Sequence, residues 1–365
     1  MEYRTNRRTG DRISVIGLGT SGLPEADAKE QRETLALAFE GGVNYFDLAT
    51  GDASCFPAFA DAFAGVREKV LYQLHFGADY SRGTYGWTTR ADAIRRSVAA
   101  QLKALKTDTI DYAFIHCIDE AEDWENYQKN GALAYLLSLK EQGVAKHVGV
   151  SSHTPAMVNA VLDSGLADMV MFSINPAYDY GRGDEYGRGE AEERRTLYRR
   201  CEAEGVGISV MKAFCGGQLL RADTSPFGRA LTEYQCIAYA LDTPGVLTVL
   251  PGVRGTADVA RVLGYFDADD AARDYAELSS FTPKEPGGKC VYCNHCKPCP
   301  AGLDIGLINK YYDLARAGDA LAKEHYASLA LHAGGCISCG HCDKRCPFGV
   351  RQNARMKEIA AYFGQ

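Results

Sequence analysis

Eight short apolar runs, each the length of a β-strand, recur along the chain and are separated by segments long enough for helices. They occupy residues 14–19, 43–47, 69–76, 110–116, 145–152, 169–174, 207–213 and 246–253. A parallel (β/α)8 barrel requires this alternation, because each parallel strand returns through a crossover helix. A doubly wound open sheet is the alternative, but the first strand-to-helix turn, GLGTSGLP, lacks the GxGxxG spacing. We therefore predict an α/β chain with a (β/α)8 TIM barrel, and a hairpin at residues 3–12 that plugs its bottom.

The length of the chain suits one large domain and a smaller one. It has 365 residues, of which 46% are hydrophobic and 24% charged, so a sizeable core is expected. The segment TPKEPGGK, residues 282–289, is rich in proline, glycine and lysine and is typical of a domain edge. We predict a barrel over residues 1–283 and a second domain over residues 284–365.

Charge and hydropathy exclude some classes of partner. The net charge of -7 disfavours a general nucleic-acid surface, which needs a basic field. No run approaches the ~18 apolar residues of a membrane span, and the polar residues 1–12 have no signal-peptide core. We expect a cytoplasmic protein that acts on a small molecule.

Eight of the thirteen cysteines lie in two tight runs, CVYCNHCKPCP and CISCGHCDKRCP, near the end of the chain. The spacing CxxCxxCxxxCP is that of bacterial ferredoxins, in which three thiolates hold one cluster and the fourth reaches a second. The second run fits fully, and the first has one residue fewer in its last gap. The sequence therefore predicts two 4Fe-4S clusters with these ligands: Cys290, Cys293, Cys296, Cys299, Cys336, Cys339, Cys342 and Cys346.

The ferredoxin rule also predicts how the two runs share their ligands. One cluster is held by Cys290, Cys293, Cys296 and Cys346, and the other by Cys336, Cys339, Cys342 and Cys299. Zinc is a competing use, although it usually takes two separated cysteine pairs, and a single cluster with one degenerate run is a further alternative. The segment between the runs has helical periodicity, so this domain should be mainly α-helical.

Polar residues stand where the predicted strands end, which is the face that carries the chemistry of (β/α)8 barrels. They are Asp47, His75, His116, Ser151, Ser152, His153, Asn175, Lys212, Gly252 and Arg254. Carboxylates and imidazoles at one barrel mouth form an acid/base set.

The motifs GVNYFD, TDTIDYAFIH, VGVSSHTP, VMKAFCGGQLL and VLTVLPGVRGTADV follow one another in this order. In this respect the chain resembles the aldo-keto reductase superfamily over about residues 1–280, and with its cysteine runs it is similar to the iron–sulfur branch. The resemblance implies a catalytic set of Asp, Tyr, Lys and His. Asp47 and His116 match the family Asp and His, whereas Asp52 stands at the position of the Tyr and His75 at that of the Lys.

Two of the four catalytic positions are thus replaced, including the proton donor. We expect His116 to donate a proton or stabilise an oxyanion, with help from His75, while Asp47 and Asp52 set the local charge. Tyr80 and Tyr85, in the glycine-containing loop GADYSRGTYGW expected after the third strand, are weaker candidates for the missing phenol.

The resemblance also implies a site for NAD(P)H. Ser151 or Ser152 and Asn175 would hold the carboxamide. Residues after strands seven and eight would hold the phosphates, since glycine lets backbone N–H groups approach an anion; the candidates are Lys212, Gly216, Gly217, Gly252 and Arg254. A flavin is not excluded, but no pattern marks its site.

These features predict an oxygen-sensitive oxidoreductase that acts on a carbonyl, alcohol or polyol-like molecule, with clusters that relay electrons to or from the barrel or a partner protein. One alternative is an enzyme with purely structural clusters. Another is an electron-transfer or binding protein whose barrel has lost catalysis. The sequence leaves homo-oligomerisation open.

Overall fold

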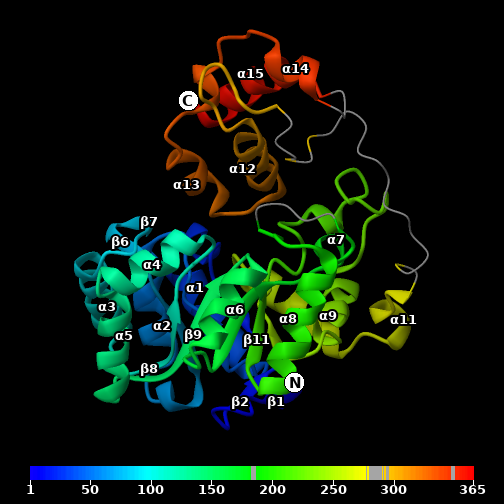
Figure 1. Ribbon diagram of the computed structural model, residues 1–365. Helices are drawn as coiled ribbons and strands as arrows, with labels where there is room; N and C mark the ends of the chain where they lie inside the picture. The colour runs from blue at the N-terminus through cyan, green and yellow to red at the C-terminus, as the bar shows by residue number, and fades with distance from the viewer. Residues whose placement is uncertain (182–185, 277, 279–289, 291, 293–295, 347–349) are drawn as a thin grey trace. The chain divides into compact units, whose positions relative to one another are not determined.

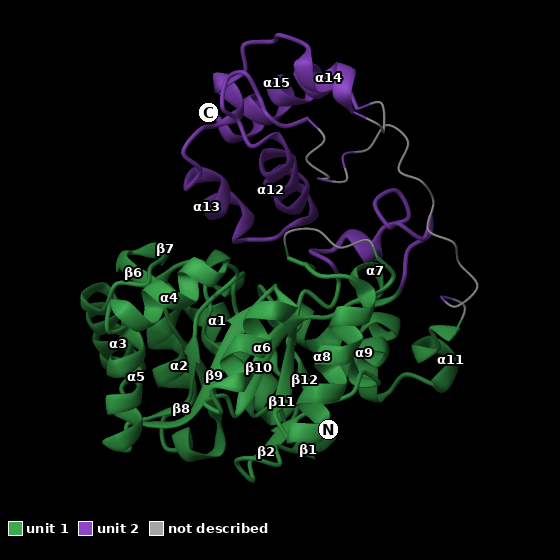
Figure 2. Cartoon of the chain, viewed as in Figure 1, with its two compact units in different colours: residues 1–214, 232–277 green, residues 215–231, 278–365 purple. Residues whose placement is uncertain are grey.

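The computed structural model describes residues 1–181, 186–276, 278, 290, 292, 296–346 and 350–365 (Figure 1). The chain divides into two compact units (Figure 2). The barrel unit comprises Met1–Phe214 and Thr232–Glu277, and the C-terminal unit comprises Cys215–Leu231 and Leu278–Gln365. The predicted boundary at 283/284 lies outside the described residues and stays a prediction.

Eight parallel strands form the barrel, and all eight coincide with the predicted apolar runs. Their order in the sheet is β12-β11-β10-β9-β8-β5-β4-β3, and the bridges Ile16–Val249 and Gly19–Gly252 join the two edge strands. The strands are β3 (Leu18–Gly19), β4 (Tyr45–Asp47), β5 (Leu71–Phe76), β8 (Ile110–Ile115), β9 (Ala145–Ser152), β10 (Met169–Ser173), β11 (Gly207–Met211) and β12 (Val246–Val249). The predicted (β/α)8 fold is confirmed.

Helices follow the strands and cover the outside of the barrel (Figure 1). In α3, Ile94, Val98 and Leu105 are buried at helical spacing. The helices of this unit are α1 (Ala28–Glu40), α2 (Phe56–Ala62), α3 (Ala91–Leu105), α4 (Ala121–Lys129), α5 (Ala132–Glu141), α6 (Pro155–Asp163), α7 (Pro176–Asp179), α8 (Ala191–Glu204), α9 (Glu233–Leu241), α10 (Thr256–Leu263) and α11 (Asp270–Arg273).

Two antiparallel hairpins lie outside the barrel sheet. The first, β1 (Tyr3–Thr5) and β2 (Arg12–Ser14), is the predicted one. Asn6, in its turn, donates to the carbonyl of Asp168 just before β10 (3.1 Å), so the hairpin meets the end of the barrel where the strands begin. The second, β6 (Ala78–Arg82) and β7 (Thr84–Trp87), replaces the loop that we expected after the third predicted strand.

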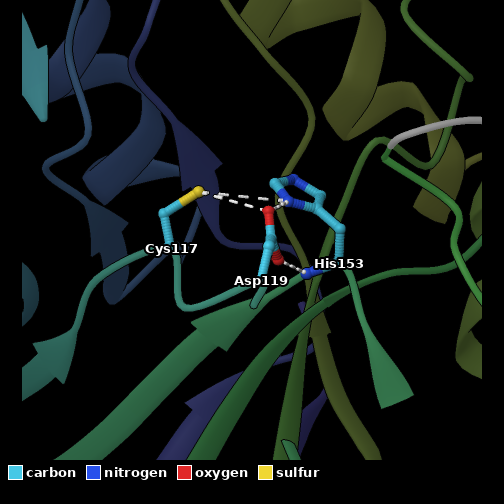
Figure 3. Close-up of side chains that lie close together, drawn as sticks. All are labelled: Cys117, Asp119 and His153. Atoms are coloured by element: carbon cyan, nitrogen blue, oxygen red, sulfur yellow. Dashed lines mark hydrogen bonds and ion pairs between the residues drawn. The ribbon is translucent and has the colours of Figure 1, made fainter. Parts of the chain in front are cut away.

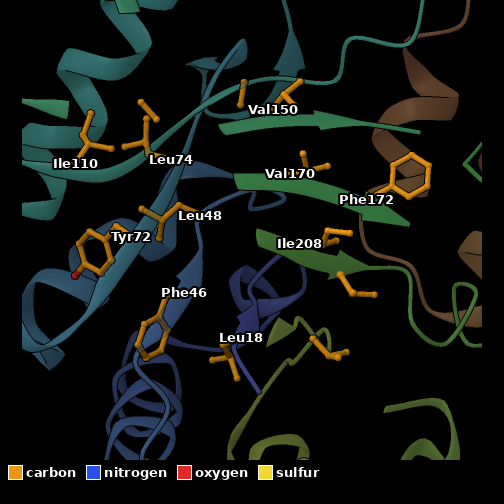
Figure 4. Close-up of a cluster of buried hydrophobic side chains, with 14 of the residues drawn as sticks. Leu18, Phe46, Leu48, Tyr72, Leu74, Ile110, Val150, Val170, Phe172 and Ile208 are labelled. Atoms are coloured by element: carbon orange, nitrogen blue, oxygen red, sulfur yellow. The ribbon is translucent and has the colours of Figure 1, made fainter. Parts of the chain in front are cut away.

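The alternation of side chains along the strands separates two apolar layers and also positions the site. One phase packs against the helices and includes Phe46, Tyr72, Leu74, Val150, Val170 and Phe172 (Figure 4). The other phase fills the barrel interior with Tyr45, Tyr112, Phe114, Met169 and Met171. Successive side chains of a strand point to opposite faces. Asp47, His75, His116 and Ser151 therefore share the interior phase at the strand ends.

The C-terminal unit is helical, as predicted. It contains α12 (Ile305–Ala317), α13 (Ala322–Ala327), α14 (His341–Arg345) and α15 (Gln352–Phe363). Its core holds Ile308, Tyr326 and Met356. No helix in the described part of the chain is both long and apolar enough to cross a membrane.

The segment Cys215–Leu231 follows β11 but belongs to the C-terminal unit. It packs against α12 so closely that a Cβ atom at Gly216 would lie 2.3 Å from Leu314 Cδ2. At Gly217 a Cβ atom would lie 3.0 Å from the carbonyl oxygen of Ala317, and both glycines have positive φ. The segment therefore needs glycine at both positions.

Candidate functional site

Four side chains from three strands and one hairpin form a continuous hydrogen-bonded row at the barrel mouth. Asp47 Oδ1 lies 2.7 Å from His75 Nε2, and His75 Nδ1 lies 2.8 Å from His116 Nδ1. His116 Nε2 lies 2.8 Å from the phenol oxygen of Tyr85. We call Asp47, His75, His116 and Tyr85 the polar row.

The donor and acceptor capacities of the side chains determine the direction of each hydrogen bond in the polar row. A carboxylate only accepts hydrogen bonds, so His75 Nε2 carries a proton and donates to Asp47 Oδ1. When both imidazoles are neutral, His75 Nδ1 accepts from His116 Nδ1–H, and His116 Nε2 accepts the O–H of Tyr85. One added proton reverses the last two bonds, because His75 becomes an imidazolium and His116 then donates to Tyr85. The row therefore stores one mobile proton.

Burial and neighbouring groups hold the first part of the row in place. Asp47, His75 and His116 are only 4%, 1% and 7% exposed. The side-chain amide of Gln73 donates to Asp47 Oδ1 (3.1 Å), and its oxygen accepts from Tyr45 (2.7 Å). Rigid, desolvated partners strengthen a hydrogen-bonded network.

The β6–β7 hairpin places Tyr85, and not Tyr80, in contact with His116. Tyr85, on β7, contacts His116, whereas Tyr80, on β6, points its phenol at the chain after β4 and accepts from the N–H of Thr50 (3.0 Å). Burial raises the pKa of Tyr80, as expected for a structural phenol. Asp52 caps the short helix Ala53–Cys55 by accepting from the N–H of Ser54 (2.7 Å). The hydrogen bonds described for Asp52 thus serve the local chain rather than the row.

The two serines at the end of β9 contact different groups of residues. Ser151 Oγ accepts from the N–H of Cys117 (2.8 Å) and lies 3.3 Å from His116 Nδ1. Ser152, on the opposite phase, donates to Asp119 Oδ1 (3.1 Å). The predicted serines are therefore engaged with different partners.

A second group of polar side chains, Cys117, Asp119 and His153, lies beside the row (Figure 3). We call it the Cys117 cluster. Burial alone would raise the pKa of Asp119, but the charge and hydrogen bonds of His153, together with the charge of Arg188, leave it well below its ordinary range. Burial, with the nearby Asp119 carboxylate, raises the pKa of the Cys117 thiol. Cys117 is thus not an activated nucleophile in this environment.

Asn175 and Lys212 follow β10 and β11. Asn175 is fully buried; its oxygen caps α7 by accepting from the N–H of Tyr178 (3.0 Å), and its amide donates to the carbonyl of Lys212 (2.9 Å). The ammonium of Lys212 lies 4.5 Å from the centre of the Tyr186 ring. Both residues thus have partners within the barrel unit.

The start of α10, where the sequence predicts a phosphate site, is bound to the protein's own carboxylates. The N–H and hydroxyl groups of Thr256 donate to Glu30 Oε1 (2.8 and 2.9 Å), and Arg254 pairs with Glu25 (3.2 Å). Open space surrounds the Cα atom of Gly252 on the side where a Cβ would lie. Gly216 and Gly217, predicted for the same role, lie in the C-terminal unit against α12.

Four of the predicted cluster ligands line one pocket of the C-terminal unit. They are Cys299, Cys336, Cys339 and Cys342, which we call the thiol pocket. Burial raises the pKa of Cys342 to about 11. Four thiols around one pocket are suited to bind a metal ion or cluster, which would hold them as thiolates.

The other four predicted ligands are described only in part. Cys293 lies outside the described residues. Cys296 is buried, and Cys290 and Cys346 are half-buried. Burial raises the pKa of Cys290. The sharing of these thiols in a second cluster stays a prediction.

Sequence reasoning missed Glu30 and Asp119. Asp119 carried a usable signal, because it lies just beyond the fourth predicted strand and beside the polar residues of the barrel mouth. Glu30 carried none, since it lies on α1 and meets Thr256 only through the closure of the barrel.

Comparison with known families agrees with both units. Residues 15–233 match the model of the aldo/keto reductase family, and residues 289–351 match that of the 4Fe-4S dicluster domain. The first match covers more than half of the chain. The protein therefore belongs to the aldo/keto reductase family and carries a C-terminal 4Fe-4S dicluster domain.

Individual relatives are distant. L-glyceraldehyde 3-phosphate reductase of Escherichia coli is 26% identical over 173 residues, which are 45% of this chain and 49% of that protein. D-galacturonate reductase of Fragaria ananassa is 22% identical over 247 residues, 61% of this chain and 65% of that protein. The chain thus spans about half to two thirds of the curated relatives that it matches.

Solved structures show the same fold. An aldo-keto reductase of Bacillus halodurans has a TM-score of 0.62 at 19% identity and covers 77% of this chain and 96% of its own. An aldo/keto reductase of Klebsiella pneumoniae, in complex with NADP and acetate, has a TM-score of 0.55 at 19% identity and covers 78% and 97%.

Proposed function

We propose that the protein interconverts a small carbonyl compound and its alcohol, with Tyr85 as the proton donor and the rest of the polar row as its proton reservoir. The observation that carries the proposal is the unbroken hydrogen-bonded row from Asp47 to Tyr85. It supplies a phenol in place of the family tyrosine, whose position holds Asp52 in this chain, and a pair of histidines in place of the family lysine, whose position holds His75.

In the direction of reduction, the row starts with its extra proton. His116 then donates to the phenol oxygen of Tyr85, so the O–H of Tyr85 can turn toward a substrate carbonyl. As the carbonyl carbon is reduced, Tyr85 gives this proton to the oxygen and regains one from His116 Nε2. His116 regains one at Nδ1 from His75, which returns to the neutral form. One proton leaves the row for each carbonyl reduced.

Oxidation of an alcohol uses the neutral row. The O–H of Tyr85 then points at His116 Nε2, so its oxygen can accept the substrate's hydroxyl proton as its own proton passes to His116. The imidazolium that forms at His75 is paired with Asp47. Mildly acidic conditions should therefore favour reduction and alkaline conditions oxidation.

We propose NAD(P)H as the hydride source, since the Klebsiella relative is a complex with NADP. A bound nicotinamide supplies the hydride. Gly252 leaves room beside the backbone for a ligand phosphate. To bind that phosphate, Arg254 must release Glu25 and Thr256 must release Glu30. None of the relatives named above points to a flavin.

We propose that the eight cysteines of the two runs hold two 4Fe-4S clusters, which would carry electrons one at a time to or from a partner protein. The thiol pocket supports one of the predicted ligand sets. A partner protein that donates or accepts single electrons, and sensitivity to oxygen, follow from this proposal. The names of the curated relatives refer to sugar-type carbonyl compounds, which favours a hydroxycarbonyl or polyol substrate.

The test is the Tyr85→Phe variant, which keeps the ring and removes only the hydroxyl. Anaerobic turnover is measured with DL-glyceraldehyde as the carbonyl probe and NADH or NADPH as the reductant. We expect kcat to fall by about 10²–10⁴-fold, the usual contribution of a positioned acid. The pH profile should change with it.

Tyr135→Phe is the matched control, because this half-buried tyrosine on α5 packs against Phe76 and Arg95 away from the row. A Tyr85→Phe variant with unchanged turnover would refute the proposal. Absence of turnover in the folded, cluster-loaded wild type would instead favour a barrel that has lost catalysis.

A further inference from the structure

The Cys117 cluster brings three different donor atoms to one point at the barrel mouth. Cys117 Sγ lies 3.7 Å from Asp119 Oδ2 and 4.0 Å from His153 Nδ1, and the last two atoms lie 2.8 Å apart. Cys117 and Asp119 follow β8, and His153 follows β9 (Figure 3).

The arrangement does not fit a nucleophilic triad. In a triad the base receives the nucleophile's proton on one ring nitrogen and holds the carboxylate with the other. Here the thiol and the carboxylate both lie on the Nδ1 side of His153. Three donors that converge on one point instead form the pattern of a chelate.

We propose that Cys117, Asp119 and His153 bind one divalent zinc ion. Zinc accepts thiolate, imidazole and carboxylate together, whereas magnesium and calcium take oxygen ligands. A tetrahedral zinc with bonds of ~2.0–2.3 Å holds its ligand atoms ~3.3–3.6 Å apart. The sulfur distances are already close to this, and the Asp119–His153 pair has to open by only about 0.5 Å when zinc replaces the proton between them.

The surroundings hold the ligands in place for an ion. The other oxygen of Asp119 accepts from the N–H of His153 (2.6 Å) and the hydroxyl of Ser152 (3.1 Å). The ring of His153 packs edge-on against Tyr186, with ring centres 5.0 Å apart. Hydrogen-bonded carboxylates and fixed rings are the outer-shell features that orient metal ligands.

Three protein ligands leave the fourth zinc position for water or a substrate oxygen, as in catalytic zinc sites. Ser151 links the backbone of this cluster to the polar row, since its hydroxyl contacts both the N–H of Cys117 and His116 Nδ1. The zinc site itself does not depend on the proposed function.

The test uses the full-length, cluster-loaded protein, dialysed against zinc chloride under anaerobic conditions. We expect one zinc per chain by mass spectrometry of the metals, and affinity at least tenfold weaker in Cys117→Ser and His153→Gln with iron content unchanged. Cys201→Ala and His147→Gln are the matched controls; the first is a buried helical cysteine and the second a barrel histidine beside Asp11.

X-ray absorption at the zinc edge identifies the ligands. We expect one sulfur at ~2.3 Å and two or three nitrogen or oxygen atoms at ~2.0–2.1 Å, with the sulfur lost in Cys117→Ser. A shell of four sulfurs would place zinc in the cluster cysteines and overturn the proposal. So would zinc binding that Cys117→Ser leaves unchanged, or a folded wild type that binds no zinc.

A measurement on the wild type alone covers the case in which the variants fold poorly. Peptide mass spectrometry follows the alkylation of Cys117 by iodoacetamide. Equimolar zinc should slow it at least fivefold, and equal rates with and without zinc would contradict the proposal.

Discussion

The barrel unit and the C-terminal unit differ in the side chains that they bring together. In the barrel unit, Asp179 is 2% exposed and accepts hydrogen bonds from Arg194 (2.9 Å), Tyr198 (2.7 Å) and Tyr239 (3.0 Å). The C-terminal unit instead gathers four thiols around a pocket. The barrel unit thus pairs its charges internally, whereas we expect the fold of the C-terminal unit to depend on what its thiols bind.

The largest effect should come from Cys339→Ala. Cys339 is exposed, so its truncation removes little packing. If it holds a cluster, the variant should lose about four of about eight iron atoms per chain. The C-terminal unit should then become sensitive to protease while the barrel unit stays resistant. Iron analysis and limited proteolysis measure the two effects.

Lys344→Ala, at an exposed position on nearby α14, is the control and should keep all its iron. If Cys339→Ala keeps the iron content of the wild type, the C-terminal unit does not depend on this thiol in the way that we expect. If glyceraldehyde turnover survives the loss of iron, the clusters are structural rather than catalytic.

Asp179→Asn should have the next largest effect, on the barrel unit alone. The variant leaves the guanidinium of Arg194, whose side chain is 0% exposed, without its counter-charge. Breaking a buried pair in this way costs about 3–5 kcal/mol of unfolding free energy. Both tryptophans, Trp87 and Trp124, lie in the barrel unit, so their fluorescence during urea unfolding reports on it.

The exposed pair on α1 provides the control for this prediction. Glu33→Gln removes a carboxylate that lies 3.6 Å from Lys29 at the surface. Such pairs contribute at most about 1 kcal/mol. Equal losses from Asp179→Asn and Glu33→Gln would show that internal pairing does not distinguish the barrel unit.

The smallest effect concerns the carboxylate at the start of α10. Glu30→Gln keeps an oxygen that can accept from Thr256 but removes the negative charge from a helix N-terminus. A phosphate of NADPH would then no longer be repelled by a carboxylate at this helix N-terminus. NADPH should therefore bind about two- to fivefold more tightly. Fluorescence titration measures the change, with Glu33→Gln on the same helix as control. Unchanged or weaker binding would contradict the phosphate site.

The barrel was predictable from sequence because its signals are local. Each strand is a short apolar run, and the alternation within a run determines which residues face inward. Asp47, His75 and His116 could therefore be expected at one mouth. The position of a missing phenol could not, since the pairing of β6 with β7 decides that Tyr85 rather than Tyr80 contacts His116.

Family position alone did not predict what Asp52 contacts. Asp52 stands where the family has its tyrosine, and an aspartate before a short helix is a strong N-cap; its carboxylate here accepts from the N–H of Ser54. The cysteine spacing was more informative, because short gaps between ligands restrict where the thiols can lie. It predicted the four cysteines that line the thiol pocket.

The assignment of Cys215–Leu231 to the C-terminal unit has a consequence for how the protein is made. A ribosome releases this segment well before α12, against which its glycines pack. During translation, residues 215–231 therefore lack their packing partner until α12 has been synthesised. Shortening the gene before α12 would leave that loop without its packing surface, so residues 215–231 should be open to protease in such a truncated protein.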